Sequence, residues 1–139
     1  LQAIAAYDDQ RHPYQGIVDF EVKLNRGGLL SIAVQTYSYT GGAHGMTTVE
    51  YLNLDLTTGQ ELSFNDLFPS EAEIERAAQA IDAEIAANPE WFFIDQFSSD
   101  LFAEHQGFYL QDHHVVVCFG LYELAPYVAC IQEFAVSAP

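Results

Sequence analysis

Histidine and cysteine are the side chains that could bind a metal ion or act as nucleophiles here, and the chain has five and two of them. No two histidines have the H-x-x-x-H spacing of a metal-binding helix face, and no H-E-x-x-H motif occurs. Asp112, His113 and His114 are contiguous in an expected hairpin turn, where adjacent side chains point in opposite directions. We therefore expect a solvated turn at this position, and neither a metal site nor a cofactor in this chain.

Nucleophilic and acid–base catalysis find equally little support. No G-x-S-x-G motif occurs, and neither Cys118 nor Cys130 lies beside a histidine or at a helix start. The many acidic residues could supply a pair of catalytic carboxylates, but no spacing singles out a pair. The glycines of residues 41–45 are not followed by a lysine or a helix, as those of a phosphate-binding loop would be. We therefore expect that this chain by itself is not an enzyme.

A glycine-rich loop surrounds the histidine whose role is most open. Gly41, Gly42 and Gly45 place three glycines in five residues, and glycine permits unusual backbone angles and close approach of a neighbour. Between them, His44 could be a metal ligand, a contact for a partner, or a hydrogen-bonding residue that holds the loop. The sequence favours the structural role, and a partner contact comes second.

Most of the chain shows the period of two that is typical of half-buried strands. Val18, Phe20, Val22 and Leu24 alternate with Asp19, Glu21 and Lys23. The same pattern predicts further strands at residues 30–39, 49–56, 61–64, 107–111, 114–121 and 131–136. Glycine-containing turns separate several of them, so the strands are expected to pair antiparallel.

The pattern changes to helical spacing after Pro69. Ser70 and Glu73 form a capping box, and apolar residues then recur at helical spacing as far as Ile85. A second, shorter helix is expected from Pro89 on, with residues 91–95 in the core, and the last turns of another helix at residues 1–7. The predicted fold is therefore α+β: an antiparallel sheet with one long and one or two short helices packed on one face.

The size and charge of the chain limit its partners. Its 139 residues, half of them hydrophobic, are expected to form a single domain over residues 1–139, and the start at Leu1 suggests that the N-terminal part is truncated. Four basic against twenty acidic residues give a formal net charge of −16, which repels nucleic acids and anionic membranes. No stretch approaches the ~20 apolar residues of a membrane span. We expect no nucleic-acid or membrane contact, whereas a basic partner would be attracted.

The two cysteines lie on either side of an irregular segment, residues 122–127. Cys118 falls in one expected strand and Cys130 begins the last one, so antiparallel pairing could bring them together. A disulfide there would close a ring of about 13 residues and stabilise the fold by ~3 kcal/mol in the chain-entropy model. The alternative is two buried free thiols.

Several motifs in one order resemble a known family. They are Tyr39-Thr-Gly-Gly-Ala-His-Gly45, Asp55-Leu-Thr-Thr-Gly59, Leu62 with Asp66-Leu67-Phe68, Tyr122-Glu-Leu-Ala-Pro-Tyr127 and Glu133-Phe134. From about Phe20 to Val136 the chain resembles the C-terminal extracytoplasmic domain of RsiV, a lysozyme-sensing anti-sigma factor. The same domain is found beside the catalytic domain of PdaC-type peptidoglycan deacetylases. In this family a glycine usually stands where this chain has Cys130, which strengthens the disulfide hypothesis.

The resemblance implies a bacterial, extracytoplasmic domain, in the cell envelope or secreted. Our first hypothesis is a non-catalytic recognition domain that binds a lysozyme or a similar basic protein acting on the cell wall. The alternative is a glycan-binding accessory module of a peptidoglycan deacetylase, with tyrosines and Trp91 as stacking platforms. In the first hypothesis two neighbouring loops bind the partner, and their residues are Tyr39, Thr40, Gly41, Gly42, Ala43, His44, Gly45, Pro126 and Tyr127. Both loops could instead be turns that only stabilise the fold.

Overall fold

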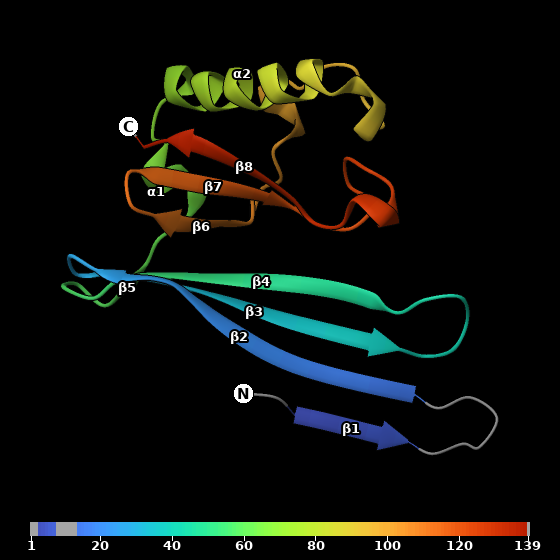
Figure 1. Ribbon diagram of the computed structural model, residues 1–139. Helices are drawn as coiled ribbons and strands as arrows, with labels where there is room; N and C mark the ends of the chain where they lie inside the picture. Colours follow the sequence, from blue (N-terminus) through green and yellow to red (C-terminus); the bar gives the residue numbers. More distant parts are fainter. Residues whose placement is uncertain (1–2, 8–13, 139) are drawn as a thin grey trace.

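Two antiparallel sheets and a long helix make up the computed structural model, which describes residues 3–7 and 14–138 (Figure 1). The first sheet has the strand order β1-β2-β3-β4-β5, and the second has the order β6-β7-β8. The strands are β1 (Ala3–Tyr7), β2 (Tyr14–Arg26), β3 (Leu29–Tyr39), β4 (Met46–Asp55), β5 (Gln60–Glu61), β6 (Phe108–Gln111), β7 (His114–Phe119) and β8 (Gln132–Ser137).

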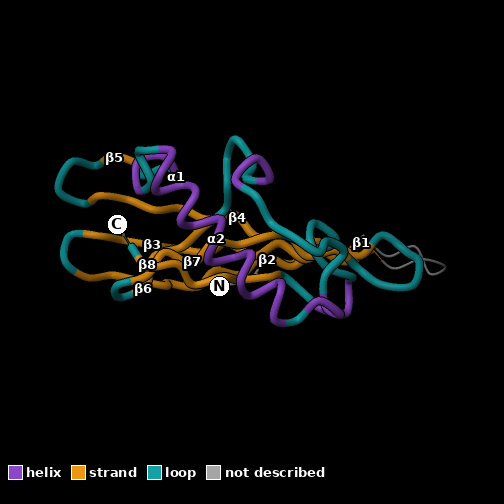
Figure 2. Tube along the Cα trace, turned by 90° about the horizontal axis from the view of Figure 1, so that it is seen from above, coloured by secondary structure: helices purple, strands orange, loops and turns teal. Residues whose placement is uncertain are grey.

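The helices lie between the two sheets in sequence, with one more helical turn before β8. They are α1 (Phe64–Leu67), α2 (Glu71–Ala87) and the 3₁₀ turns η1 (Pro89–Trp91), η2 (Ser99–Leu101) and η3 (Tyr127–Ala129). The predicted capping box of α2 is present: Ser70 Oγ accepts from the Glu73 amide, and the Glu73 carboxylate accepts from the Ser70 amide. Seen from above, α2 runs obliquely over the strands (Figure 2). In the described part of the chain no helix is long and apolar enough to cross a membrane.

The main core lies between α2 and the three-stranded sheet. Ile81 and Ile85 of α2 are fully buried and face Val115 and Val117 of β7. Phenylalanines from α1, the irregular segment before β6 and all three strands fill the rest: Phe64, Phe68, Phe97, Phe108, Phe119 and Phe134. Burial of this much aromatic and aliphatic surface is the main stabilising term of the fold.

A buried polar joint holds the two sheets together. Asn53 on β4 donates from Nδ2 to the carbonyl of Phe108 (2.9 Å) and accepts from Ser31 Oγ (2.6 Å). Ser31 on β3 in turn accepts from the amide of Leu110 (3.0 Å). Both side chains are at most 2% exposed. They satisfy backbone groups of β6 that have no strand partner on this side, so they close the edge of the three-stranded sheet.

The α+β class and the long helix are confirmed, and three local expectations are corrected. The strands form two sheets, because side chains of β3 and β4, instead of a strand, pair with the open edge of β6. Residues 3–7 form β1 on the edge of β2 and are not helical, because strand pairing outweighs a weak local preference. The expected second helix is the single turn η1, and Trp91 and Phe93 are 54% and 60% exposed instead of buried.

Candidate functional site

Two loops far apart in sequence meet through three aromatic rings. The ring of His44, in the glycine loop after β3, stacks on the ring of Tyr127 with centroids 3.9 Å apart and planes 17° apart. Tyr122 lies beside both, with its hydroxyl 3.1 Å from His44 Nε2. We call His44, Tyr122 and Tyr127 the loop surface. The structure therefore places the two predicted loops side by side.

The hydrogen bonds of His44 define its tautomer. Nδ1 lies 3.1 Å from the carbonyl of Gly45, which can only accept, so Nδ1 carries a proton. In the neutral ring Nε2 is then an acceptor, and it receives the Tyr122 hydroxyl proton. His44 thus ties the glycine loop to the second loop, which is the structural role that the sequence favoured.

The glycines of the first loop have two separate functions. Gly41 and Gly42 have φ values of 101° and 102°, which other residues rarely adopt. At Gly45 a Cβ would lie only 2.4 Å from the ring of Tyr37, so the absence of a side chain lets that ring pack there. Tyr39 closes the loop by donating its hydroxyl to the carbonyl of Gly42 (2.8 Å).

The second loop stores backbone strain at both ends. Tyr122 has φ 65°, and Cys130 has φ 61° with ψ −162°. Tyrosine in the left-handed region is uncommon, and the angles of Cys130 belong to a region that only glycine occupies readily. Leu124 and Ala125 are buried and anchor the loop in the core. Strain that a packed anchor maintains is common at functional sites.

The nine residues predicted to contact a partner have different environments. Thr40, Gly42, Ala43 and His44 are exposed, whereas Gly45 is buried. Tyr39, Gly41, Pro126 and Tyr127 are half-buried. The analysis of the sequence left Tyr122 out of this set, although it belongs to the same motif. Tyr122 reaches His44 from a left-handed backbone conformation, and a tyrosine in the sequence does not indicate such a conformation.

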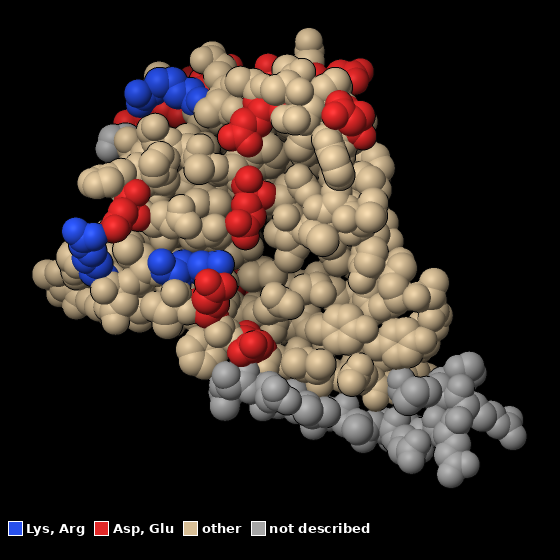
Figure 3. Space-filling model, in the orientation of Figure 1, with Lys and Arg blue, Asp and Glu red and all other residues tan. Residues whose placement is uncertain are grey.

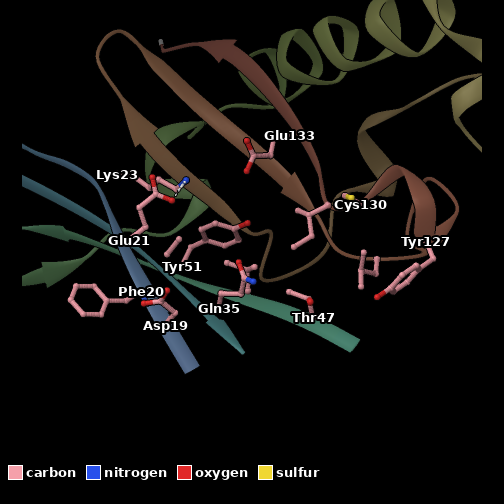
Figure 4. Close-up of a pocket in the computed structure, with 14 residues that line it drawn as sticks. Asp19, Phe20, Glu21, Lys23, Gln35, Thr47, Tyr51, Tyr127, Cys130 and Glu133 are labelled. Atoms are coloured by element: carbon pink, nitrogen blue, oxygen red, sulfur yellow. Dashed lines mark hydrogen bonds and ion pairs between the residues drawn. The ribbon is translucent and has the colours of Figure 1, made fainter. Parts of the chain in front are cut away.

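A cleft of about 450 Å³ opens between the two sheets next to the loop surface (Figure 4). Lys23 of β2 donates to Glu21 (2.8 Å), and its ammonium lies 4.7 Å from the centroid of the Tyr109 ring. Tyr109 donates its hydroxyl to Glu133 Oε2 on β8 (3.0 Å). The other lining residues come from β2–β4 and from the segment before β8: Asp19, Phe20, Ala33, Gln35, Thr47, Val49, Tyr51, Leu121, Tyr127, Cys130 and Ile131.

Tyr51 lines the cleft and packs against Tyr109 and Cys118, and all three groups have a raised pKa. Burial raises the pKa of the Cys118 thiol to about 12. Burial also raises the pKa of Tyr51 and of Tyr109, and hydrogen bonds to Cys118 and Glu133 add to this. A thiol with a raised pKa is a poor nucleophile, because only the thiolate attacks. The raised pKa therefore argues against Cys118 as a nucleophile.

Metal binding finds no support in the part of the chain that the structure describes. Residues 3–7 and 14–138 contain no group of three or more His, Cys, Asp or Glu side chains that could hold an ion. His113 has φ 66° in the turn between β6 and β7, and His114 follows it at the start of β7. His12 lies outside the described residues.

The predicted disulfide between Cys118 and Cys130 is wrong for this structure, in which both thiols are free. In the β7–β8 register Cys118 pairs with Glu133, three residues beyond Cys130. Cys118 is buried and its Sγ approaches the carbonyl of Val116, whereas Cys130 is exposed in the turn that ends η3. The left-handed backbone of Cys130 accounts for a glycine at this position in the family that the sequence resembles.

Two family models match separate parts of the chain. Residues 2–47 match the family described as deacetylase PdaC, and residues 65–138 match a protein family of unknown function, DUF3298. The first match covers β1 to the beginning of β4, and the second runs from α1 to β8. No curated protein matches the chain.

Two solved structures share this fold. A DUF3298 family member from Bacteroides fragilis NCTC 9343 is 23% identical over 89% of this chain, with a TM-score of 0.70. A DUF3298 family protein from Pseudomonas aeruginosa PAO1 is 27% identical over 86%, with a TM-score of 0.67. The matched regions span 51% and 56% of those two proteins, so this chain corresponds to about half their length.

Proposed function

This chain belongs to the DUF3298 family, and on that premise we propose that it is a non-catalytic recognition domain that binds a basic protein outside the cytoplasm. The observation that carries the proposal is the loop surface. Two loops are joined by the His44–Tyr127 stack and by the hydrogen bond between His44 and Tyr122, which are 78 positions apart. Tyr122 is 46% exposed, so the joined rings are accessible. Rigid, amphipathic tyrosines are typical anchors of protein interfaces, because they bury much area at small entropic cost.

Charge supports a basic partner. The formal net charge is −16, and carboxylates extend over the visible face from α2 towards β2, while the few cations lie on its left half (Figure 3). A field of one sign accelerates the encounter with a partner of opposite charge, and this effect weakens as salt rises. Within that class we propose a lysozyme, in line with the RsiV-like sequence motifs. The PdaC match at residues 2–47 supports a location outside the cytoplasm.

Calorimetry with a lysozyme at two salt concentrations tests the proposal. We expect binding heat at both, with lower affinity at the higher salt. Tyr127→Ala removes the ring that stacks on His44 and should weaken binding by tenfold or more, as expected for a central aromatic anchor.

Leu56→Ala is the matched control for this experiment. Leu56 is also an exposed apolar residue (51%), but it follows the end of β4 opposite to the glycine loop, roughly 30 Å away at the rise of a strand. Its removal should leave the affinity unchanged. Absence of heat at either salt, or equal affinity of the native chain and Tyr127→Ala, would contradict the proposal.

A wall-glycan accessory module is the second candidate, and the PdaC match favours it. The tyrosines available as stacking platforms are largely engaged: Tyr51 packs against Tyr109 and Gly107, and Tyr37 packs against Gly45. Trp91 is exposed. Retention on purified peptidoglycan without affinity for a lysozyme would select this function over the first.

A further inference from the structure

The cleft between the sheets adjoins the loop surface through one shared residue. Tyr127 stacks on His44 on the loop surface and also lines the cleft. Figure 4 shows Tyr127 at one end of the cleft and Glu21 and Lys23 at the other, with Tyr51 and Glu133 between them. A protein seated on the loop surface therefore lies next to the mouth of the cleft.

The charged groups of the cleft are mainly carboxylates. Asp19, Glu21 and Glu133 line it, against the single ammonium of Lys23. Lys23 is bound to Glu21 on the same strand, at 2.8 Å. Glu133 lies on the opposite wall and accepts a hydrogen bond from the Tyr109 hydroxyl. This bond orients the carboxylate but brings no positive charge to it. A cationic group that enters the cleft can therefore pair with a carboxylate that is already oriented.

Most of the remaining lining is apolar or aromatic, with Gln35 and Thr47 as polar side chains. Ala33, Val49 and Ile131 contribute aliphatic wall, and Tyr51 and Tyr127 contribute rings. A long basic side chain has the same two parts, since its methylene stem packs on apolar surface while its charged end pairs with carboxylates. The planar guanidinium also stacks on aromatic rings and is less strongly hydrated than an ammonium.

The orientation of β2 turns its charged residues towards the cleft. Asp19, Glu21 and Lys23 line it, whereas Val18 and Val22 of the same strand are 37% and 48% exposed and do not. The Glu21 side chain is 70% exposed, so its carboxylate stays accessible at the cleft.

We propose that this cleft binds an arginine side chain carried by an exposed segment of the basic partner. The inference rests on the proposed function, because the partner is the protein that the loop surface recognises. The guanidinium pairs with Glu133 and stacks on the ring of Tyr51, and the methylene stem lies along Val49 and Ile131. The volume of about 450 Å³ is within the range of small-ligand sites and accommodates such a side chain with its neighbouring backbone.

An NMR titration with the capped tripeptide Gly-Arg-Gly tests the cleft without the partner. We expect amide shifts that concentrate at Gln35 and Ile131, and weaker shifts with Gly-Lys-Gly. Glu133→Gln should weaken the arginine peptide at least fivefold, while its amide oxygen still accepts the Tyr109 hydroxyl and preserves the fold. Glu84→Gln makes the same change of charge on the exposed surface of α2 and should have no effect.

Three results would overturn the inference: shifts spread over the whole surface, equal weakening in both glutamine variants, or equal binding of a Gly-Gln-Gly peptide. The lysozyme experiment and the peptide experiment can fail independently of each other. If a lysozyme binds and Glu133→Gln leaves its affinity unchanged, the cleft is not the arginine site although the loop surface is a recognition site. If the arginine peptide binds in the cleft and no lysozyme binds, the cleft stands and the partner class is wrong.

Discussion

The two sheets of this molecule differ in how many of their faces are covered. Both faces of β7 are buried: Val115 and Val117 pack under α2, and Val116 and Cys118 pack against Tyr51 and Tyr109. The five-stranded sheet is covered on one face only by the described chain, and Val18, Phe20 and Val22 of β2 remain exposed on the other (Figure 1). The covered face of this sheet is the polar one, which joins β6 and forms the cleft.

The three-stranded sheet therefore mainly stabilises the fold, and the five-stranded sheet mainly supplies the surfaces proposed for recognition. The three-stranded sheet and α2 contain most of the apolar core, so substitutions there act on the free energy of unfolding. The five-stranded sheet provides one wall of the cleft and, between β3 and β4, the glycine loop. The two functions meet at the joint of Ser31 and Asn53 and at the His44–Tyr127 stack.

The largest effect is expected where the sheets are joined. Asn53→Leu removes the partner of the Phe108 carbonyl and of the Ser31 hydroxyl, both inside the protein. An unsatisfied buried group costs about 1–3 kcal/mol, so we expect a loss of about 3 kcal/mol in the free energy of unfolding, measured by urea titration. Asn65→Leu, on the exposed side of α1, should change it by less than about 0.5 kcal/mol.

The same titration tests the prediction of a single domain. If residues 1–139 fold as one unit, the native chain unfolds in one transition by both tryptophan fluorescence and circular dichroism. Two separated transitions would contradict that prediction and would indicate that the two sheets fold independently.

One substitution made in each sheet sharpens the comparison. Val117→Ala removes two buried carbons from a side chain that is 0% exposed, which should cost about 2–3 kcal/mol from lost burial and the cavity left behind. Val22→Ala makes the same change at 48% exposure and should cost about 0.5 kcal/mol. Equal losses, measured by urea titration, would show that the outer face of β2 is covered in solution.

The doubly buried sheet should also make the protein sensitive to alkali. The unfolded Cys118 thiol loses its proton near its ordinary pKa of 9.0, whereas the folded thiol, with a pKa of about 12, keeps it. Between these values the folded state binds more protons, so stability falls as pH rises, by up to about 1.4 kcal/mol per pH unit and group. The raised pKa of Tyr51 and Tyr109 adds a loss of the same sign above pH 10.

Urea titrations of the native chain at pH 8, 9, 10 and 11 measure this effect. Cys118→Ala should reduce the slope between pH 9 and 11, because one of the contributing groups is gone. A free energy of unfolding that is constant over this range would show that the thiol and the phenols ionise in the folded state as readily as in water.

The smallest effect is expected outside the regular strands, at Cys130. Its φ of 61° and ψ of −162° cost a residue with a side chain about 1–3 kcal/mol. Cys130→Gly relieves this strain but adds chain entropy to the unfolded state, about 0.5–1 kcal/mol, so the net gain should be about 1 kcal/mol. Thermal unfolding should show a higher Tm. Cys118→Gly, in the middle of β7, should lower it, and a lower Tm for both would contradict the strain argument.

The local sequence pattern was sufficient to predict most of the strands and the long helix. Ser70 and Glu73 predict the start of α2, and alternation predicts β2 to β4 and the strand β7, although not that both faces of β7 are buried. The close approach expected at the glycine loop is present where Tyr37 packs on Gly45. These signals are visible in the sequence because each depends on residues within a few positions of one another.

Local pattern gave the wrong prediction for the disulfide, for the burial of Trp91 and for the helix at the N-terminus, and it did not predict the cleft. A period of two tells which residues share a face, but not which face another part of the chain will cover. Cys118 and Cys130 are apart because the β7–β8 register aligns Glu133 with Cys118, and that register depends on the packing of Phe134 and Val136 in the core.

The sequence by itself thus determined the strands, the long helix, the acidic surface and the loop glycines, since these follow from local preference and composition. Only the tertiary structure decided that the strands divide into two sheets, that His44 meets Tyr122 and Tyr127, and that carboxylates line the space between the sheets. The physical reason is that such contacts join residues far apart in the sequence, 78 positions for His44 and Tyr122, and their energies depend on which surfaces are buried together.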